Sequence, residues 1–194
     1  MPHSHAQQAR EILANAELIF DEAAVQAAVD RIAADLNARF DRADSASYPL
    51  VLGVMGGAVV FAGQLLTRLK FPLEFDYIHV TRYGNKSQGG RIEWKVEPRA
   101  DVRGRTLIVL DDILDEGETL AHVKQRLLEM GAKEVILAVF SDKDIGRAKP
   151  VAADYVGLVL PNKFVIGYGM DAYGYWRNLG SIWAVAPGSK PALG

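Results

Sequence analysis

The sequence lacks cysteine altogether, has no long hydrophobic run and carries little excess charge of either sign. Without cysteine, disulfides, thiolate zinc sites and thiol catalysis are excluded, and we expect a cytoplasmic protein. No apolar run approaches the roughly 20 residues that a membrane-spanning helix needs, and the N-terminal residues lack a secretory-signal pattern. The formal net charge of −2 offers no basic surface for nucleic acid. We therefore expect neither a membrane nor a nucleic acid as partner.

The overall composition is ordinary, with 49% hydrophobic and 24% charged residues among 194. This length favours one domain with a sizeable core. Within it we expect N-terminal helices in residues 1–42, a core in residues 48–160 and a small C-terminal segment in residues 161–186.

Two helices are predicted before the core. Over residues 7–20, apolar side chains recur at helical spacing and share one face, namely Ile12, Leu13, Ala16, Ile19 and Phe20. Asp21 is expected to cap a second helix that runs to about Phe40. Its predicted buried stripe is Val25, Val29, Ile32, Ala33 and Leu36. The sequence leaves open whether these helices pack on the core or on a partner subunit.

Short apolar runs predict strands in the remainder of the chain, at residues 50–55, 75–81, 91–96, 107–110, 134–140, 153–160 and 181–186. Helical patterns lie between some of these runs, at residues 59–69 and from residue 120 to Gly131. Strands that alternate with helices favour an α/β fold with a mostly parallel sheet flanked by helices.

The stretch LIVLDDILDEGETL at residues 107–120 carries the strongest chemical signal. A buried-strand pattern stops at Asp111 and Asp112, and Asp115 opens a loop before a helix. Backbone N–H groups of such a loop and the positive end of the helix dipole suit a phosphate. Carboxylates just before the loop suit ribose hydroxyls or Mg²⁺. The alternative is a solvated turn in which Asp115 merely caps the helix.

In order and spacing, this stretch closely resembles the phosphoribosyl-pyrophosphate signature of the type I phosphoribosyltransferases. The resemblance implies that Asp111 and Asp112 hold the ribose hydroxyls, directly or through Mg²⁺. It implies that residues 115–119 (Asp115, Glu116, Gly117, Glu118 and Thr119) cradle the 5′-phosphate, and that Asp115 is the general base. Because carboxylates oppose an anion, Glu116 and Glu118 are expected to turn away from it.

Two further segments match this family in part. Met55 and Gly56 occupy the place of its pyrophosphate loop, where a non-proline cis peptide points a backbone N–H at the pyrophosphate. Purine-specific members often have Lys where this chain has Gly56. Arg82, Tyr83 and Gly84 stand where the family's mobile lid carries a Ser-Tyr-Gly-like signature, with Arg82 in place of Ser.

The segment PNKFVIGYGMD at residues 161–171 resembles the purine hood of hypoxanthine-guanine phosphoribosyltransferases. Phe164 offers a face for stacking, Lys163 a donor for the 6-oxo group and Val165 in-plane backbone contacts. By the same resemblance, Lys143 lies near the base and pyrophosphate, and Arg177 binds pyrophosphate. Asp171 lies near the purine and joins Asp111 and Asp112 as a metal ligand.

The expected reaction transfers the phosphoribosyl group of phosphoribosyl pyrophosphate to hypoxanthine or guanine, giving IMP or GMP and pyrophosphate, with Mg²⁺ as cofactor. The resemblance also implies a homodimer or homotetramer. A phosphoribosyltransferase for xanthine, adenine or a pyrimidine remains a close alternative. A nucleotide-sensing regulator without catalysis on the same fold is a more distant one.

Overall fold

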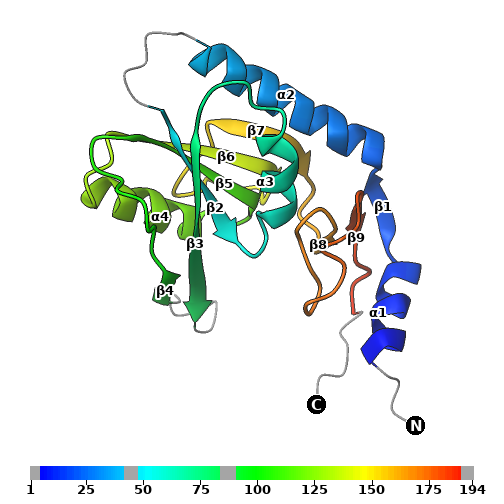
Figure 1. Cartoon of the computed structure of the whole chain (residues 1–194). Coiled ribbons are helices and arrows are strands. Elements are labelled where there is room, and N and C mark those ends of the chain that lie inside the picture. Colours follow the sequence, from blue (N-terminus) through cyan, green and yellow to red (C-terminus); the bar gives the residue numbers. More distant parts are fainter. Residues whose placement is uncertain (1–4, 42–47, 84–90, 189–194) are drawn as a thin grey trace.

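The structure, a computed structural model, describes residues 5–41, 48–83 and 91–188, and Figure 1 shows its arrangement. In these residues a six-stranded sheet has the order β4-β3-β2-β5-β6-β7. The strands are β2 (Leu50–Met55), β3 (Glu74–Tyr83), β4 (Arg91–Val96), β5 (Thr106–Leu114), β6 (Glu134–Lys143) and β7 (Tyr155–Leu160). β4 pairs antiparallel with β3, and the other neighbours pair in parallel.

Helices cover both faces of this sheet. α2 (Glu22–Phe40) and α3 (Val59–Leu66) lie on one face, and α4 (Glu118–Glu129) lies on the other (Figure 1). Side chains of a strand alternate between the two faces. Accordingly, Val51 packs in the cluster under α2 and α3, whereas Leu50 and Leu52 pack under α4. The predicted fold class, a mostly parallel sheet flanked by helices, is confirmed.

The second predicted helix is confirmed as α2. The Asp21 carboxylate accepts a hydrogen bond of 2.8 Å from the Ala24 amide, which satisfies one of the unpaired donors of the first turn. All five residues of its predicted stripe are buried. They join the cluster that also contains Phe61 of α3 and Phe140 of β6. α2 therefore packs on the core of its own chain.

The first predicted helix is wrong in its second half. α1 (His5–Ala14) ends where the Asn15 side chain donates to the Glu11 carbonyl, and residues 17–20 form β1 (Glu17–Phe20). β1 pairs antiparallel with β9 (Ile182–Ala184), which also pairs with β8 (Val165–Ile166). The helical spacing of these residues is overridden by this pairing, because intrinsic helix propensity contributes less than the hydrogen bonds and side-chain packing that the strand gains.

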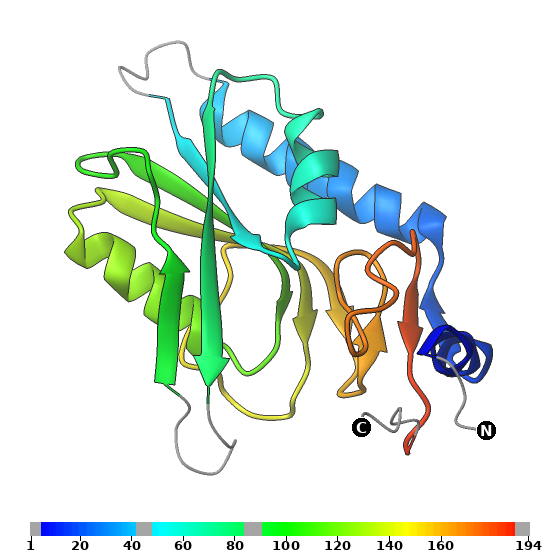
Figure 2. The same cartoon turned by 60° about the horizontal axis from the view of Figure 1, so that its bottom comes forward.

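The three-stranded sheet β1-β9-β8 forms a small second layer beside the main sheet, and we call it, with residues 161–181, the hood (Figures 1 and 2). α1 packs against it: Ile12 is buried with Ile166, Ala172 and Val185. The Trp176 indole N–H donates to the Ala9 carbonyl at 2.7 Å. Both ends of the described chain thus contribute to the hood.

Two central strands run further than predicted. β5 was expected to stop before Asp111 but continues to Leu114. β6 was expected to stop before Ser141 but continues to Lys143. Their parallel register extends through Asp111↔Val139 and Leu114↔Asp142, so ladder hydrogen bonds keep the polar ends extended. α3 is shorter than predicted, because the chain tightens into i→i+3 hydrogen bonds after Leu66.

No helix in the described ranges is both long and apolar enough to cross a membrane.

Candidate active site

The candidate site lies at the carboxyl ends of β2, β5 and β6, the edge at which open α/β sheets bind ligands. A cavity of about 280 Å³ opens there. It is lined by Arg82 and by residues 111–120, which are the end of β5, the following loop and the first turn of α4. The structure therefore places the residues of the predicted phosphate signature around one cavity.

Asp111 and Asp112 are both buried, although each was expected in a turn. Burial raises the pKa of Asp111 well above its ordinary value, and the adjacent charge of Asp112 adds to the increase. Burial also raises the pKa of Asp112, against the lowering influence of the Arg177 charge. The Ser141 hydroxyl donates to the Asp112 carbonyl at 2.8 Å. This bond fixes the main chain at Asp112, and both carboxylates lie at a site that disfavours their charge.

Gly57 is required by the position of Asp112. A Cβ atom at Gly57 would lie 2.2 Å from the Asp112 carboxylate, and a Cβ atom at Gly169 would lie 2.2 Å from the Gly57 carbonyl oxygen. The turn after β2 therefore lies close to the Asp112 side chain at the end of β5, and its backbone lies close to that of the hood. The peptide bond between Met55 and Gly56, at the start of this turn, is cis as expected.

The loop of residues 115–119 leads into α4, with Gly117 at the N-cap in a left-handed conformation, at φ 84°. Asp115 does not occupy the cap, so the alternative of a simple capping residue does not hold. Its carboxylate instead accepts from the Lys143 ammonium at 2.9 Å. The Asp115 side chain stays about half exposed, at 49%, whereas that of Lys143 is buried, at 9%. A carboxylate that is oriented and still accessible can exchange a proton with a ligand.

Lys149 is a supporting residue that sequence reasoning missed. Its ammonium donates to the Leu114 carbonyl at 2.7 Å and to the Lys143 carbonyl at 2.6 Å, and it pairs with the Asp142 carboxylate. It thereby ties together the strand ends that carry Asp115 and Lys143. A lone lysine in a loop gives no sequence signal for these contacts, and the one with Leu114 depends on β5 and β6 pairing in space.

Glu116 and Glu118 form ion pairs with the same arginine side chain. The Arg82 guanidinium contacts Glu116 at 2.9 Å and Glu118 at 2.6 Å. Arg82 was expected in a lid, but it lies within β3, where it is paired with Ile92 of β4. Tyr83 ends the same strand, and Gly84 lies outside the described residues. That the two glutamates turn away from a bound anion stays a prediction.

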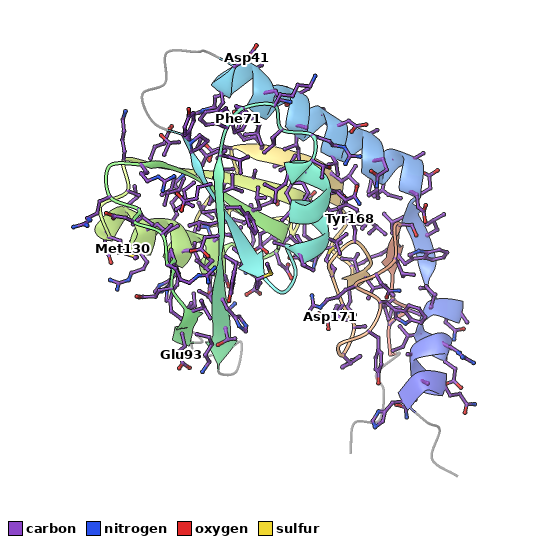
Figure 3. All side chains as sticks on the ribbon, viewed as in Figure 1. Asp41, Phe71, Glu93, Met130, Tyr168 and Asp171 are labelled. Carbon is purple, nitrogen blue, oxygen red and sulfur yellow. The ribbon has the colours of Figure 1, made fainter. Side chains whose placement is uncertain are left out.

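In the hood, Arg177 and Asp171 form an ion pair of 2.6 Å. The second Asp171 oxygen accepts from the Gly174 amide at 2.6 Å, and Arg177 also donates to the Gly169 carbonyl. Figure 3 shows Asp171 and Tyr168 on this segment, which borders the turn after β2. Arg177 therefore lies in the hood within electrostatic reach of Asp112, where its positive charge opposes the rise in the pKa of that carboxyl.

The predicted purine-stacking residue Phe164 is 50% exposed, and its ring meets that of Tyr173 edge-on at 6.4 Å. Lys163 pairs with Glu17 of β1 at 2.6 Å, so its ammonium has a partner that the sequence did not indicate. Val165 lies in β8, opposite Ala184 of β9. Glu17, Lys163, Phe164 and Tyr173 contribute to a cavity of about 660 Å³.

The three predicted metal ligands are not gathered into one cluster. Among the residues that the structure describes, no group of three or more acidic or histidine side chains is placed to hold a metal ion. Asp171 is engaged by Arg177 and Gly174. Asp111 and Asp112 nevertheless form an all-oxygen donor pair, which fits a hard cation such as Mg²⁺. Their raised pKa values fit it too, because a bound cation would compensate charges that burial disfavours.

The sequence and the fold of this chain are similar to those of known proteins. A family model for the phosphoribosyl transferase domain matches residues 15–172. The hypoxanthine-guanine phosphoribosyltransferase of Bacillus subtilis is 30% identical over 172 residues, which are 88% of this chain and 93% of that protein. A solved structure of a hypoxanthine-guanine phosphoribosyltransferase from Bacillus anthracis is 28% identical, with a TM-score of 0.80, and covers 88% of this chain and 98% of that one.

The bifunctional protein TilS/HprT of Listeria innocua is 35% identical over 88% of this chain, but the match spans only 26% of that longer protein. With the family model matching well over half of its residues, the chain belongs to the phosphoribosyl transferase domain family. Within it, the predicted similarity to the hypoxanthine-guanine phosphoribosyltransferases is confirmed.

The raised pKa of Asp111 predicts a pH-dependent effect of Asp111→Asn. Between the unfolded pKa of about 3.9 and the higher folded value, the folded chain holds more protons than the unfolded chain, so its stability falls as pH rises. The neutral amide removes this penalty. We expect Asp111→Asn to raise the free energy of unfolding at neutral pH by about 1 kcal/mol or more, with the gain vanishing near pH 4.

Urea unfolding in EDTA-containing buffer, from about pH 4 to about pH 8, measures this difference. Asp101 is the matched control, because its pKa is lowered to about 2 by hydrogen bonds from Arg103. Asp101→Asn should therefore give no gain at neutral pH. A destabilised Asp111→Asn protein at pH 7 would contradict the prediction.

Proposed function

We propose that this protein transfers the 5-phosphoribosyl group from phosphoribosyl pyrophosphate to N9 of hypoxanthine or guanine, releasing IMP or GMP and pyrophosphate. The observation that carries the proposal is the convergence of the Asp111–Asp112 pair, the loop of residues 115–119 and the hood at one sheet edge. The named relatives support the choice of substrates.

Phosphoribosyl pyrophosphate would lie along the carboxyl edge of the sheet. Backbone N–H groups at the start of α4 suit its 5′-phosphate, and the Asp111 and Asp112 oxygens suit its ribose hydroxyls. Arg177 and the Met55–Gly56 backbone would bind the pyrophosphate. When bound at these aspartates, Mg²⁺ would supply positive charge for the phosphate oxygens of the substrate.

The 6-oxopurine would stack on Phe164, whose half-exposed ring is ready for a planar partner. The backbone of Val165 and the Asp171 carboxylate would meet the edge of the base. Lys163 would donate to the 6-oxo group once the base competes with Glu17 for its ammonium. Lys143 would lie on the opposite side, next to Asp115.

In the reaction, N9 of the purine forms a bond to C1′ of the ribose as the bond from C1′ to the pyrophosphate oxygen breaks. The purine gives up one proton, which Asp115 accepts or shares. Lys143 and Lys163 stabilise the electron density that builds on the base, and Arg177 stabilises the departing pyrophosphate. Dimer or tetramer assembly, the Mg²⁺ requirement and a cytoplasmic location remain parts of this proposal.

The experiment that tests the proposal is a spectrophotometric assay with phosphoribosyl pyrophosphate, Mg²⁺ and one base at a time. Hypoxanthine, guanine, xanthine, adenine and orotate should be run in parallel. We expect turnover with hypoxanthine or guanine, abolished by EDTA. Turnover of another base alone would show that the hood has been misinterpreted. Nucleotide binding without any turnover would favour the regulator.

Asp115→Asn tests the general base. The amide keeps the shape of the side chain but cannot accept the proton, so we expect kcat to fall by about 100-fold. The KM for phosphoribosyl pyrophosphate should change far less, because the loop binds the 5′-phosphate through backbone N–H groups. Steady-state kinetics with both substrates separates the two parameters. Equal losses in kcat and in phosphoribosyl-pyrophosphate binding would refute the role.

Phe164→Ala tests the stacking face. Losing the ring should raise the KM for the purine by about tenfold, in line with the 1–3 kcal/mol common for base stacking on an aromatic side chain. The KM for phosphoribosyl pyrophosphate should stay close to the wild-type value. Tyr173→Ala is a useful comparison, because it removes the neighbouring ring but leaves Phe164 in place. An unchanged purine KM in Phe164→Ala would rule out stacking on this residue.

A further inference from the structure

The phosphate loop of this chain contains two carboxylates, Glu116 and Glu118, on either side of Gly117. A 5′-phosphate carries close to two negative charges at neutral pH, so unpaired glutamates beside it would oppose its binding. Both glutamates contribute to the lining of the same cavity as the loop. Binding of the phosphate therefore requires a cation that offsets the charge of these glutamates.

We infer that Arg82 is the positioning residue that pairs with both Glu116 and Glu118, offsets part of their charge and so makes this acidic loop competent to bind the phosphate of phosphoribosyl pyrophosphate. Arg82 lies in β3, and the glutamates lie in and just after the loop that follows β5. In the sheet, β2 lies between β3 and β5. In Figure 2 the end of β3 lies beside the start of α4. The inference rests on the proposed function, because it concerns the same anion.

The contacts of Arg82 support this role. One terminal nitrogen lies 2.9 Å from Glu116 Oε2, and the other lies 2.6 Å from Glu118 Oε2. Its side chain is 25% exposed, so solvent screens these pairs less than it screens a fully exposed pair. A planar guanidinium can bridge two carboxylates in this way, whereas an ammonium offers a single charged centre.

A second cation stands further away. Arg147 lies 3.9 Å from Glu116 Oε1, and its side chain is 65% exposed. A longer and more exposed ion pair contributes less, so Arg82 carries most of the compensation. With both terminal nitrogens of Arg82 engaged by glutamates, its role is to reduce their net charge and hold them in place. Direct binding of the phosphate by Arg82 is the competing explanation.

The test compares four proteins by calorimetric binding of phosphoribosyl pyrophosphate and by steady-state kinetics at fixed Mg²⁺. They are the wild type, Arg82→Ala, the triple variant Arg82→Ala/Glu116→Gln/Glu118→Gln, and the control Arg126→Ala. The control removes Arg126 of α4, which pairs with Glu97 at 3.2 Å outside the cavity. Urea unfolding checks that each variant folds.

Arg82→Ala should weaken phosphoribosyl-pyrophosphate binding by about tenfold, because it leaves Glu118 unpaired and Glu116 with only the more distant Arg147. The purine KM should stay near wild type. The triple variant should recover to within about threefold of wild type, since the opposing charges are gone. The deficit of Arg82→Ala should also shrink as salt rises from about 0.05 M to about 0.5 M, because ions screen the repulsion.

Arg82→Lys provides a second variant with a smaller perturbation. It keeps the charge but loses the bridging geometry, so its binding deficit should lie between those of wild type and Arg82→Ala. Wild-type affinity in Arg82→Ala would overturn the inference while leaving the proposed function intact. A triple variant as weak as Arg82→Ala would overturn it too, in favour of direct phosphate binding by Arg82. A wild-type protein that binds no phosphoribosyl pyrophosphate would overturn both.

Discussion

Two adjacent aspartates, Asp111 and Asp112, sit buried in the ladder between β5 and β6, and much of the site is arranged around them. Burial disfavours the charge of both, as their raised pKa values show. The positive charge of Arg177 favours the ionised form of Asp112, and a glycine at position 57 leaves room for its carboxylate, where no side chain would fit. Buried acidic groups of this kind suit a ligand that brings hydroxyls or a cation.

The rim of the site follows a similar electrostatic logic. Asp115 pairs with Lys143, Asp142 pairs with Lys149, and the two glutamates of the loop pair with Arg82. Lys143 and Arg82 come from strands other than β5, which precedes the loop that they contact, whereas Lys149 lies seven residues after Asp142. An anion that enters this edge therefore meets paired carboxylates and the backbone N–H groups of α4, and the local field is less repulsive than the acidic sequence suggests.

The hood depends on residues from both ends of the described chain. β1 supplies an edge strand, and its Glu17 engages Lys163, which the resemblance assigns to the purine. Gly169 approaches the carbonyl of Gly57, so the hood also touches the turn after β2. The segment that would hold the base is thus positioned relative to the phosphate site by direct backbone contact. In the proposed function, this contact would align the purine with phosphoribosyl pyrophosphate.

Much of the fold and of the site could be predicted from the sequence. Apolar runs identified the six core strands, Asp21 and its stripe identified α2, and the order of acidic and apolar residues around Asp111 identified the phosphate signature. These features are local: a strand pattern, a cap and a strand–loop–helix motif depend on neighbours in the chain. The family assignment followed from the same local order.

The tertiary structure alone decided the remaining features. Residues 17–20 became β1 because β9 offered a strand partner, although their spacing favoured a helix. Asp111 and Asp112 stayed in an extended strand because β6 continued beside them. The contact of Lys149 with Leu114 and the ion pairs of Glu17 and Arg82 likewise join elements that meet only when the chain folds. A sequence specifies local conformation through nearest neighbours, whereas long-range pairing and charge compensation are settled by which surfaces the packed core brings together.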